Sequence, residues 1–171
     1  MINENMLKAL NEQVNKELFS SYLYLSMSAY AESIGLKGFA NWLKVQAQEE
    51  LDHAMKLYNY IIERGGKIEL EEIKKPKNNW NSITEVVSEA YEHEQFITNS
   101  INELMNLATS EKDYATINML QWFVNEQVEE EASFLEILDN LNLIGDEKRG
   151  LFMLDREMGQ RTYTPLNSSE N

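Results

Sequence analysis

Four stretches of the sequence repeat apolar residues at alternating spacings of three and four, and a polar side chain interrupts each repeat near its middle. An apolar residue at every third or fourth position lines one face of an α-helix, so the pattern predicts four helices that each bury one face. The four series are Leu7, Leu10, Val14, Glu17, Ser21, Tyr24, Ser28, Ala31; Phe39, Leu43, Gln46, Glu50, His53, Leu57, Tyr60; Ile83, Val87, Ala90, Glu94, Ile97, Ile101, Leu104, Ala108; and Leu120, Phe123, Gln127, Glu130, Phe134, Ile137, Leu141. We therefore expect an all-α protein.

Glycines mark the ends of the first two helices. The first helix is expected over about residues 5–34 and ends at Gly35; the second is expected over about 38–64 and ends at Gly65. Glycine readily adopts the left-handed conformation that ends a helix, which makes these two positions natural boundaries.

Polar residues mark the later helix starts. Ser82 and Glu85 have the spacing of a capping box, which predicts a third helix that begins there and reaches about residue 109. Ser110 is expected to cap a fourth helix that ends at Gly145, and Asp146 is expected to cap a short fifth one.

The lengths of the connections predict how the helices are arranged. Short turns join the first helix to the second and the third to the fourth, so each pair should form an antiparallel hairpin. The sixteen residues 66–81 can reach about 53 Å when extended, whereas a helix of about 27 residues is about 40 Å long. The expected fold is a four-helix bundle with one long crossover and a short fifth helix. Residues 1–158 would form this domain and 159–171 a loose C-terminal tail.

Composition excludes several classes of function. The formal net charge of -14 disfavours nucleic acids and anionic membranes as partners, because both repel an acidic surface. With no cysteine, disulfides, thiolate metal sites and iron–sulfur clusters are excluded. The N-terminus lacks the apolar core of a signal peptide, and no uncharged run of 18 residues could span a bilayer. We expect a cytoplasmic protein.

The polar interruptions of the four helices predict a metal centre. Glu17, Glu50, Glu94 and Glu130 fall at one level of the bundle, where buried carboxylates repel one another unless they share a partner. Two divalent cations would balance their four negative charges. Glu50 and His53 place a carboxylate and an imidazole one turn apart, as a two-metal bundle requires. Oxygen and imidazole ligands without sulfur favour iron or manganese, with zinc as a competitor.

The segment NEQVEEEA at residues 125–132 carries four glutamates without a nearby cation. Glu126 faces Glu129 and Glu130 at helical spacings of three and four, where like charges cost about 0.2–0.5 kcal/mol per pair. No Lys, Arg or His occurs from residue 113 to 147, so the balancing charge must come from another part of the fold or from a bound cation. The alternative is a solvated acidic face.

Other side chains have simpler interpretations. Tyr24 lies one heptad from Glu17, where it could hydrogen-bond a metal ligand or donate an electron, or act only as a core tyrosine. His93 is expected at the surface. The three tryptophans and eight methionines are interpreted as packing residues.

These residues resemble those of the ferritins, and in particular of the bacterial non-haem ferritins. The resemblance covers nearly the whole chain and rests on Glu17, on EELDH from residue 49 to His53, on Glu94, and on NEQVEE from residue 125 to Glu130. It implies one iron held by Glu17, Glu50, His53 and Gln127, and a second held by Glu94, Glu130 and the bridging Glu50.

The same resemblance implies a third iron site, formed by Glu49, Glu126 and Glu129 with Glu130. Helical geometry is consistent with this, because Gln127 and Glu130 point toward the core while Glu126 and Glu129 are rotated to one flank. That flank would lie on the inner, mineral-facing side of the subunit.

Departures from neighbouring families narrow the resemblance. Haem-binding relatives carry a second Glu-x-x-His and a methionine where this chain has Gln127, Glu130 and Asp52, so no haem is expected. The family implies a shell of twenty-four subunits that oxidises Fe(II) with dioxygen or peroxide and stores ferric mineral. Two alternatives remain open from the sequence: a di-iron oxygenase or peroxide-scavenging bundle that stores nothing, and a structural helical oligomer with an acidic stripe.

Overall fold

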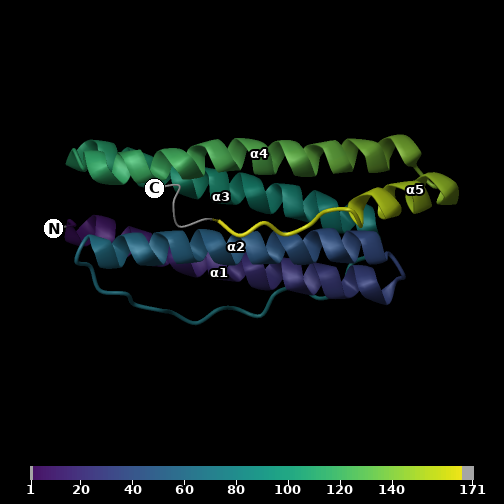
Figure 1. The fold of residues 1–171 in the computed structure, drawn as a ribbon, viewed down its shortest axis with the longest axis horizontal. Coiled ribbons are helices and arrows are strands. Elements are labelled where there is room, and N and C mark those ends of the chain that lie inside the picture. Colours follow the sequence, from purple (N-terminus) through teal and green to yellow (C-terminus); the bar gives the residue numbers. More distant parts are fainter. Residues whose placement is uncertain (1, 167–171) are drawn as a thin grey trace.

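The computed structural model describes residues 2–166, and within them the chain forms five helices and no strand. The helices are α1 (Glu4–Ser33), α2 (Lys37–Glu63), α3 (Ile83–Glu111), α4 (Tyr114–Ile144) and α5 (Lys148–Met158). Figure 1 shows α1 to α4 side by side along the long axis, with α5 folded back at one end. None of these described helices has an apolar stretch long enough to cross a bilayer. The predicted all-α bundle with a short fifth helix is confirmed.

The long connection between α2 and α3 runs along the bundle, as its length predicted (Figure 1). Polar residues of α1 hold it at several levels. The Asn11 side chain donates to the Lys67 carbonyl at 3.0 Å and accepts from the Glu69 amide at 2.9 Å, and Ser26 donates to the Lys77 carbonyl at 2.6 Å. Part of the connection's backbone therefore finds its hydrogen-bond partners in side chains on the outer face of α1.

The start of α3 agrees with the sequence, since the Glu85 amide donates to the Ser82 side chain at 3.1 Å. The predicted cap of α4 was wrong. Ser110 lies inside α3, which ends at Glu111 and is followed by the C-cap Lys112, a residue with a left-handed φ of 56°. The N-cap of α4 is Asp113, whose carboxylate accepts from the Thr116 amide at 3.2 Å.

The predicted cap of α5 was also displaced by one residue. The carboxylate that accepts from the Gly150 amide, at 3.1 Å, belongs to Glu147 rather than to Asp146. Both errors have the same cause, because several neighbouring residues could cap these helices and the backbone of the turn decides which one does.

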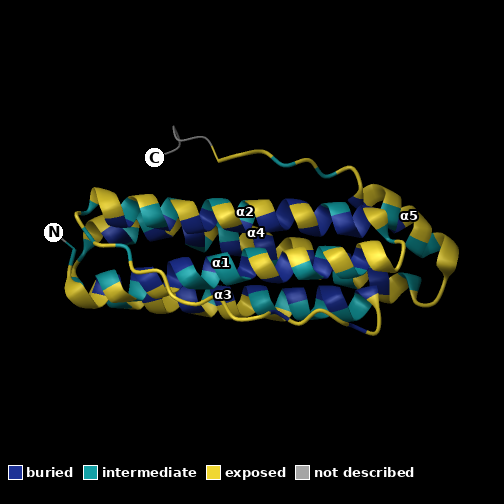
Figure 2. Cartoon of the chain, turned by 90° about the horizontal axis from the view of Figure 1, so that it is seen from below, coloured by how far each residue is buried: buried dark blue, intermediate teal, exposed yellow. Residues whose placement is uncertain are grey.

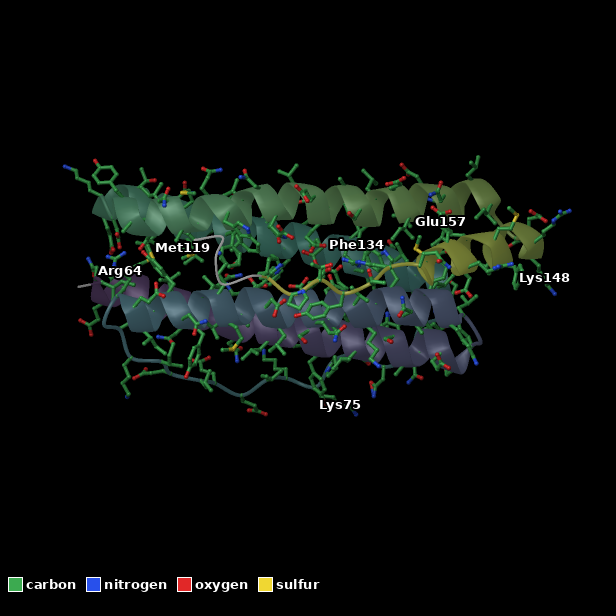
Figure 3. All side chains as sticks on the ribbon, viewed as in Figure 1. Arg64, Lys75, Met119, Phe134, Lys148 and Glu157 are labelled. Carbon is green, nitrogen blue, oxygen red and sulfur yellow. The ribbon has the colours of Figure 1, made fainter. Side chains whose placement is uncertain are left out.

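The core consists of two apolar clusters separated by a polar level. One cluster includes Phe39, Phe134 and the buried side of α5; the other includes Met6, Leu57 and the opposite ends of α1 to α4. The four sequence repeats lie on the buried faces, and every residue of the third and fourth repeats is buried. Figure 2 shows these faces turned inward along the helices. Figure 3 labels Phe134, a buried residue in the C-terminal half of α4.

Helix α5 packs on its own bundle. Leu154 and Met158 are buried in the first cluster, and the Asp155 carboxylate accepts from the Phe39 amide at 3.0 Å. The sequence stripe Leu151, Leu154 and Met158 predicts a helix face covered by other subunits, and this prediction is wrong for Leu154 and Met158. Phe152 and Met153, on the opposite face, are 61% and 63% exposed and are the side chains left for such contacts.

After α5 the chain turns back along the molecule, and residues 161–166 contain neither helix nor strand (Figures 1 and 2). Its side chains reach α2: Arg161 binds Glu49, and the Tyr163 hydroxyl donates to Asp52 at 2.7 Å. The rest of the predicted tail, residues 167–171, lies outside the described residues.

Candidate metal centre

Six side chains predicted as ligands of a two-metal centre lie at the polar level between the two apolar clusters. Each is at most 5% exposed, and they come from all four long helices: Glu17 from α1, Glu50 and His53 from α2, Glu94 from α3, Gln127 and Glu130 from α4. The helical repeat explains why they meet, because each occupies a core-facing position near mid-helix.

His53 lies at the junction of two groups of potential ligand atoms. One atom each from Glu17, Glu50 and His53 lie within 4.8 Å of one another, and so do atoms from His53, Glu126 and Glu130. The His53 Nδ1 atom is 3.3 Å from Glu50 Oε2, and its Nε2 atom is 3.9 Å from Glu126 Oε1. Potential metal ligands thus converge on both sides of the His53 imidazole.

Glu94 and Gln127 form the α3–α4 side of the centre. The Gln127 amide donates to Glu94 Oε2 at 3.0 Å, and the buried Tyr24 hydroxyl donates to Glu94 Oε1. Tyr24 also stacks on Phe134 with ring centroids 5.6 Å apart. This tyrosine is therefore both a core residue and a hydrogen-bond donor to a predicted ligand.

The carboxylates of the centre are held in an environment that favours their neutral form. Burial, followed by the neighbouring Glu50, raises the pKa of Glu17 to about 8. Burial also raises the pKa of Glu50, Glu94 and Glu130, and repulsion from Glu94 adds to this at Glu50 and Glu130. A cation bound among them would reverse the effect by stabilising the ionised carboxylates.

One carboxylate oxygen gives a direct reason to expect a cation. Glu17 Oε2 is buried and has no hydrogen-bond partner, although buried polar atoms are nearly always paired. The other oxygen, Oε1, accepts from Gln13 at 2.7 Å. An unpaired oxygen beside Glu50 and His53 suits a hard or borderline divalent ion, and the set of oxygen and imidazole donors fits iron, manganese or zinc.

The predicted third site adjoins this centre in a more open position. Glu49, Glu126, Glu129 and Glu130 line a cavity of about 260 Å³ together with Asp52, His53 and Arg161. Glu49 and Glu126 are half-buried and Glu129 is exposed. Burial raises the pKa of both Glu49 and Glu126. The flank residues thus line one cavity, and Arg161 is an unpredicted cation among them.

His93 does not lie on the open surface, contrary to the sequence interpretation. Its Nε2 atom is 2.7 Å from the Ser20 hydroxyl, and its ring lies between Phe19, Tyr24 and Phe96. Burial lowers the pKa of His93 to about 4, so this imidazole is neutral near pH 7.

Two glutamines that orient the glutamates were not predicted as functional. Gln13 donates to Glu17, and Gln46 donates at 2.8 Å to both Glu50 and Glu130. Both glutamines are fully buried. A signal was present in the sequence, because each glutamine precedes its glutamate by four residues and so lies on the same helix face.

Comparison with known proteins agrees with this geometry. The ferritin-like domain family matches residues 7–144. A bacterial non-heme ferritin of Campylobacter jejuni is 46% identical over 91% of this chain and 93% of its own length. A probable bacterial non-heme ferritin-like protein of Haemophilus influenzae is 45% identical over 93% of this chain and 96% of its own.

Solved structures lead to the same family. An open-pore ferritin from the hyperthermophilic archaeon Archaeoglobus fulgidus has a TM-score of 0.94 and 52% identity, covering 95% of this chain and 99% of its own. A form of the Archaeoglobus fulgidus ferritin engineered to be closed has a TM-score of 0.95 and 51% identity, covering 96% of this chain and 100% of its own. The chain therefore belongs to the ferritin family and groups with its bacterial non-heme members.

Proposed function

We propose that the protein oxidises Fe(II) at the buried carboxylate centre and stores the ferric product inside a shell of twenty-four subunits in the cytoplasm. The observation that carries this proposal is the unpaired, buried Oε2 atom of Glu17, next to Glu50 and His53. Four buried carboxylates without a cation are costly in the folded protein, whereas the same arrangement is suited to hold two divalent ions.

Glu17, Glu50, His53 and Gln127 would hold one iron, and Glu94 and Glu130 the other, with Glu50 bridging. The five ionisable side chains supply oxygen and imidazole donors from a rigid bundle. Gln127 is the weakest of the six because its amide is neutral. It now donates to Glu94, so binding a metal through its carbonyl oxygen would not require that bond to break. A weak ligand suits a site that releases its product.

In this reaction iron is the substrate. Each Fe(II) loses one electron, so two ions reduce one dioxygen to hydrogen peroxide, or one hydrogen peroxide to two waters, with two protons taken up. Carboxylates stabilise the higher charge of Fe(III) and therefore favour the oxidised product. Glu49, Glu126 and Glu129, with Glu130, would form the third iron site beside this centre.

The character of the adjoining cavity favours iron handling over the alternative of an oxygenase. A pocket for an organic substrate is mostly apolar with a few polar groups. Five of the ten residues that line the cavity beside His53 and Glu130 are acidic. Such a lining attracts cations, and the named relatives are ferritins rather than oxygenases.

The test is aerobic addition of Fe(II) to the metal-free protein, following oxidation by absorbance and particle size by sedimentation. His53→Ala and Glu50→Ala should each slow the initial oxidation by at least about tenfold while the particle keeps its size. Glu92→Ala, an exposed carboxylate of α3, is the matched control and should oxidise iron normally. Parental initial rates in both ligand variants would refute the assignment.

A further inference from the structure

The segment that follows α5 places one arginine in the third site. The segment lies on the outside of the bundle beside α2 (Figures 1 and 2), at a cavity that residues of α2 and α4 also line. Residues 161, 164 and 166 line the acidic cavity there. The guanidinium of Arg161 pairs with Glu49 through Nη2.

Arg161 is fixed on several sides rather than lying free on the surface. Its Nη1 atom donates to Gln46 Oε1 at 2.9 Å, its guanidinium lies 4.1 Å from the centre of the Trp42 ring, and its carbonyl accepts from Asn41 at 2.9 Å. Tyr163 anchors the next turn of the chain to Asp52. A guanidinium held by an amide, an aromatic face and a carboxylate has a defined position.

This arrangement places a positive charge in the same cavity as the acidic run of α4. Glu49, the carboxylate with which Arg161 pairs, is one of those assigned to the third site. A metal ion bound through Glu49 and the arginine compete for the same oxygen atoms, because both are cations and the carboxylate cannot satisfy both at full strength.

We propose that Arg161 is a built-in counter-cation of the third site, which neutralises Glu49 when no metal is bound and must release it for a metal to bind there. The inference rests on the proposed third site. It makes Arg161 a positioning residue that lowers the metal affinity of that site. Gln46 accepts from Arg161 and donates to both Glu50 and Glu130. Release of Arg161 therefore also changes the hydrogen bonding of these two ligands of the two-metal centre.

The experiment is calorimetric titration of the assembled, metal-free protein with Zn²⁺, which does not undergo oxidation. The heat that disappears in a Glu126→Gln, Glu129→Gln double variant identifies the third site. Arg161→Gln should tighten Zn²⁺ binding at that site by about tenfold, because a competing charge is removed. Arg156→Gln removes an equal charge from an exposed position on α5 and should bind like the parent.

Arg161→Lys distinguishes charge from a general disturbance of the segment. A lysine keeps the positive charge but loses the stacking on Trp42 and the fixed fork of donors, so its third-site affinity should lie between those of the parent and Arg161→Gln. Equal third-site affinity in the parent and Arg161→Gln would overturn the inference and leave the third site standing. Absence of any third Zn²⁺ in all variants would overturn the third site together with the inference.

Discussion

The side-chain amide of Gln13 donates to Oε1 of Glu17 across 2.7 Å, while Oε2 of the same carboxylate is buried without a partner. The orientation of this amide is determined by the hydrogen bonds on its oxygen side. Lys16 can only donate, and it donates to the Ser100 hydroxyl at 2.6 Å; Ser100 then donates to Gln13 Oε1 at 2.6 Å. The chain of bonds leaves the amide nitrogen of Gln13 facing Glu17, and leaves one oxygen of Glu17 available to a cation.

The first prediction follows from this relationship. Gln13→Leu removes a hydrogen bond that lowers the pKa of Glu17, so this pKa should rise further. A larger fraction of Glu17 is then protonated at pH 7, and a metal must displace that proton to bind. A hydrogen bond to a charged group is worth about 1.5–3 kcal/mol, so Fe(II) affinity at pH 7 should fall by about ten- to a hundredfold. Anaerobic calorimetry measures this. Gln48→Leu, at an exposed position of α2, is the control, and a parental affinity in Gln13→Leu would contradict the role assigned to Gln13.

The second prediction concerns pH. Glu17 has a pKa of about 8 in the folded, metal-free protein and 4.5 as the reference value. Its folded pKa is raised, so its contribution to stability is fully present below pH 4.5 and is lost as the pH rises to about 8. In the metal-free protein this loss is on the order of a few kcal/mol.

Glu17→Gln should remove this part of the pH dependence, since glutamine is neutral and similar in shape. The metal-free variant should unfold at a higher temperature than the metal-free parent at pH 8.5, with a smaller difference at pH 5. Thermal unfolding at both pH values measures this. If the parent unfolds at a higher temperature than Glu17→Gln at pH 8.5, burial does not make the ionised Glu17 carboxylate destabilising.

Sequence periodicity predicted the parts of the site that depend on helix geometry. Glu17, Glu50, Glu94 and Glu130 could be placed at one level because a helical repeat determines which face a residue occupies, and the long crossover follows from chain length. Arg161 could not be placed, because its position depends on how the segment after α5 turns back onto α2. Ser110 was misassigned as a cap because α3 continues past it to Glu111, and the left-handed C-cap Lys112 has no clear local signal in the sequence.

The third prediction tests the docking of α5. A Cβ atom at Gly38 would lie 1.5 Å from the carbonyl oxygen of Asp155, and this atom belongs to backbone that cannot move alone. Gly38→Ala should therefore displace α5, lower the unfolding temperature and weaken assembly of the particle, as sedimentation would detect. Gly159→Ala, where the nearest atom is 3.4 Å away, is the matched control. Normal stability and size in Gly38→Ala would mean that α5 docks differently.

The fourth prediction concerns Tyr24. Tyr24→Phe removes the hydroxyl that donates to Glu94 and that lowers the pKa of this carboxylate. The phenyl ring should still pack against Phe134, so the particle should assemble normally. We expect two Fe(II) ions still to bind in the absence of oxygen and oxidation to be several-fold slower. Oxidation at the parental rate would leave Tyr24 as a core residue only.

The last prediction returns to the acidic run of α4. Glu49 is paired with Arg161, so the cleaner change is Glu126→Gln with Glu129→Gln, which leaves that ion pair in place. Repulsion from Glu129 contributes to the raised pKa of Glu126, after burial as the main cause. Removing both charges should leave the metal-free protein at least as stable as the parent, since each like-charge pair costs about 0.2–0.5 kcal/mol.

In the same double variant, initial Fe(II) oxidation should remain fast, because the predicted ligands of the two-metal centre are intact. The ratio of iron oxidised to oxidant consumed should change. Glu136→Gln with Asp139→Asn, an exposed pair at the same spacing on α4, is the matched control. Parental stoichiometry in the double variant, together with iron-soaked crystals that show no metal beside Glu126 and Glu129, would return these residues to a solvated acidic face.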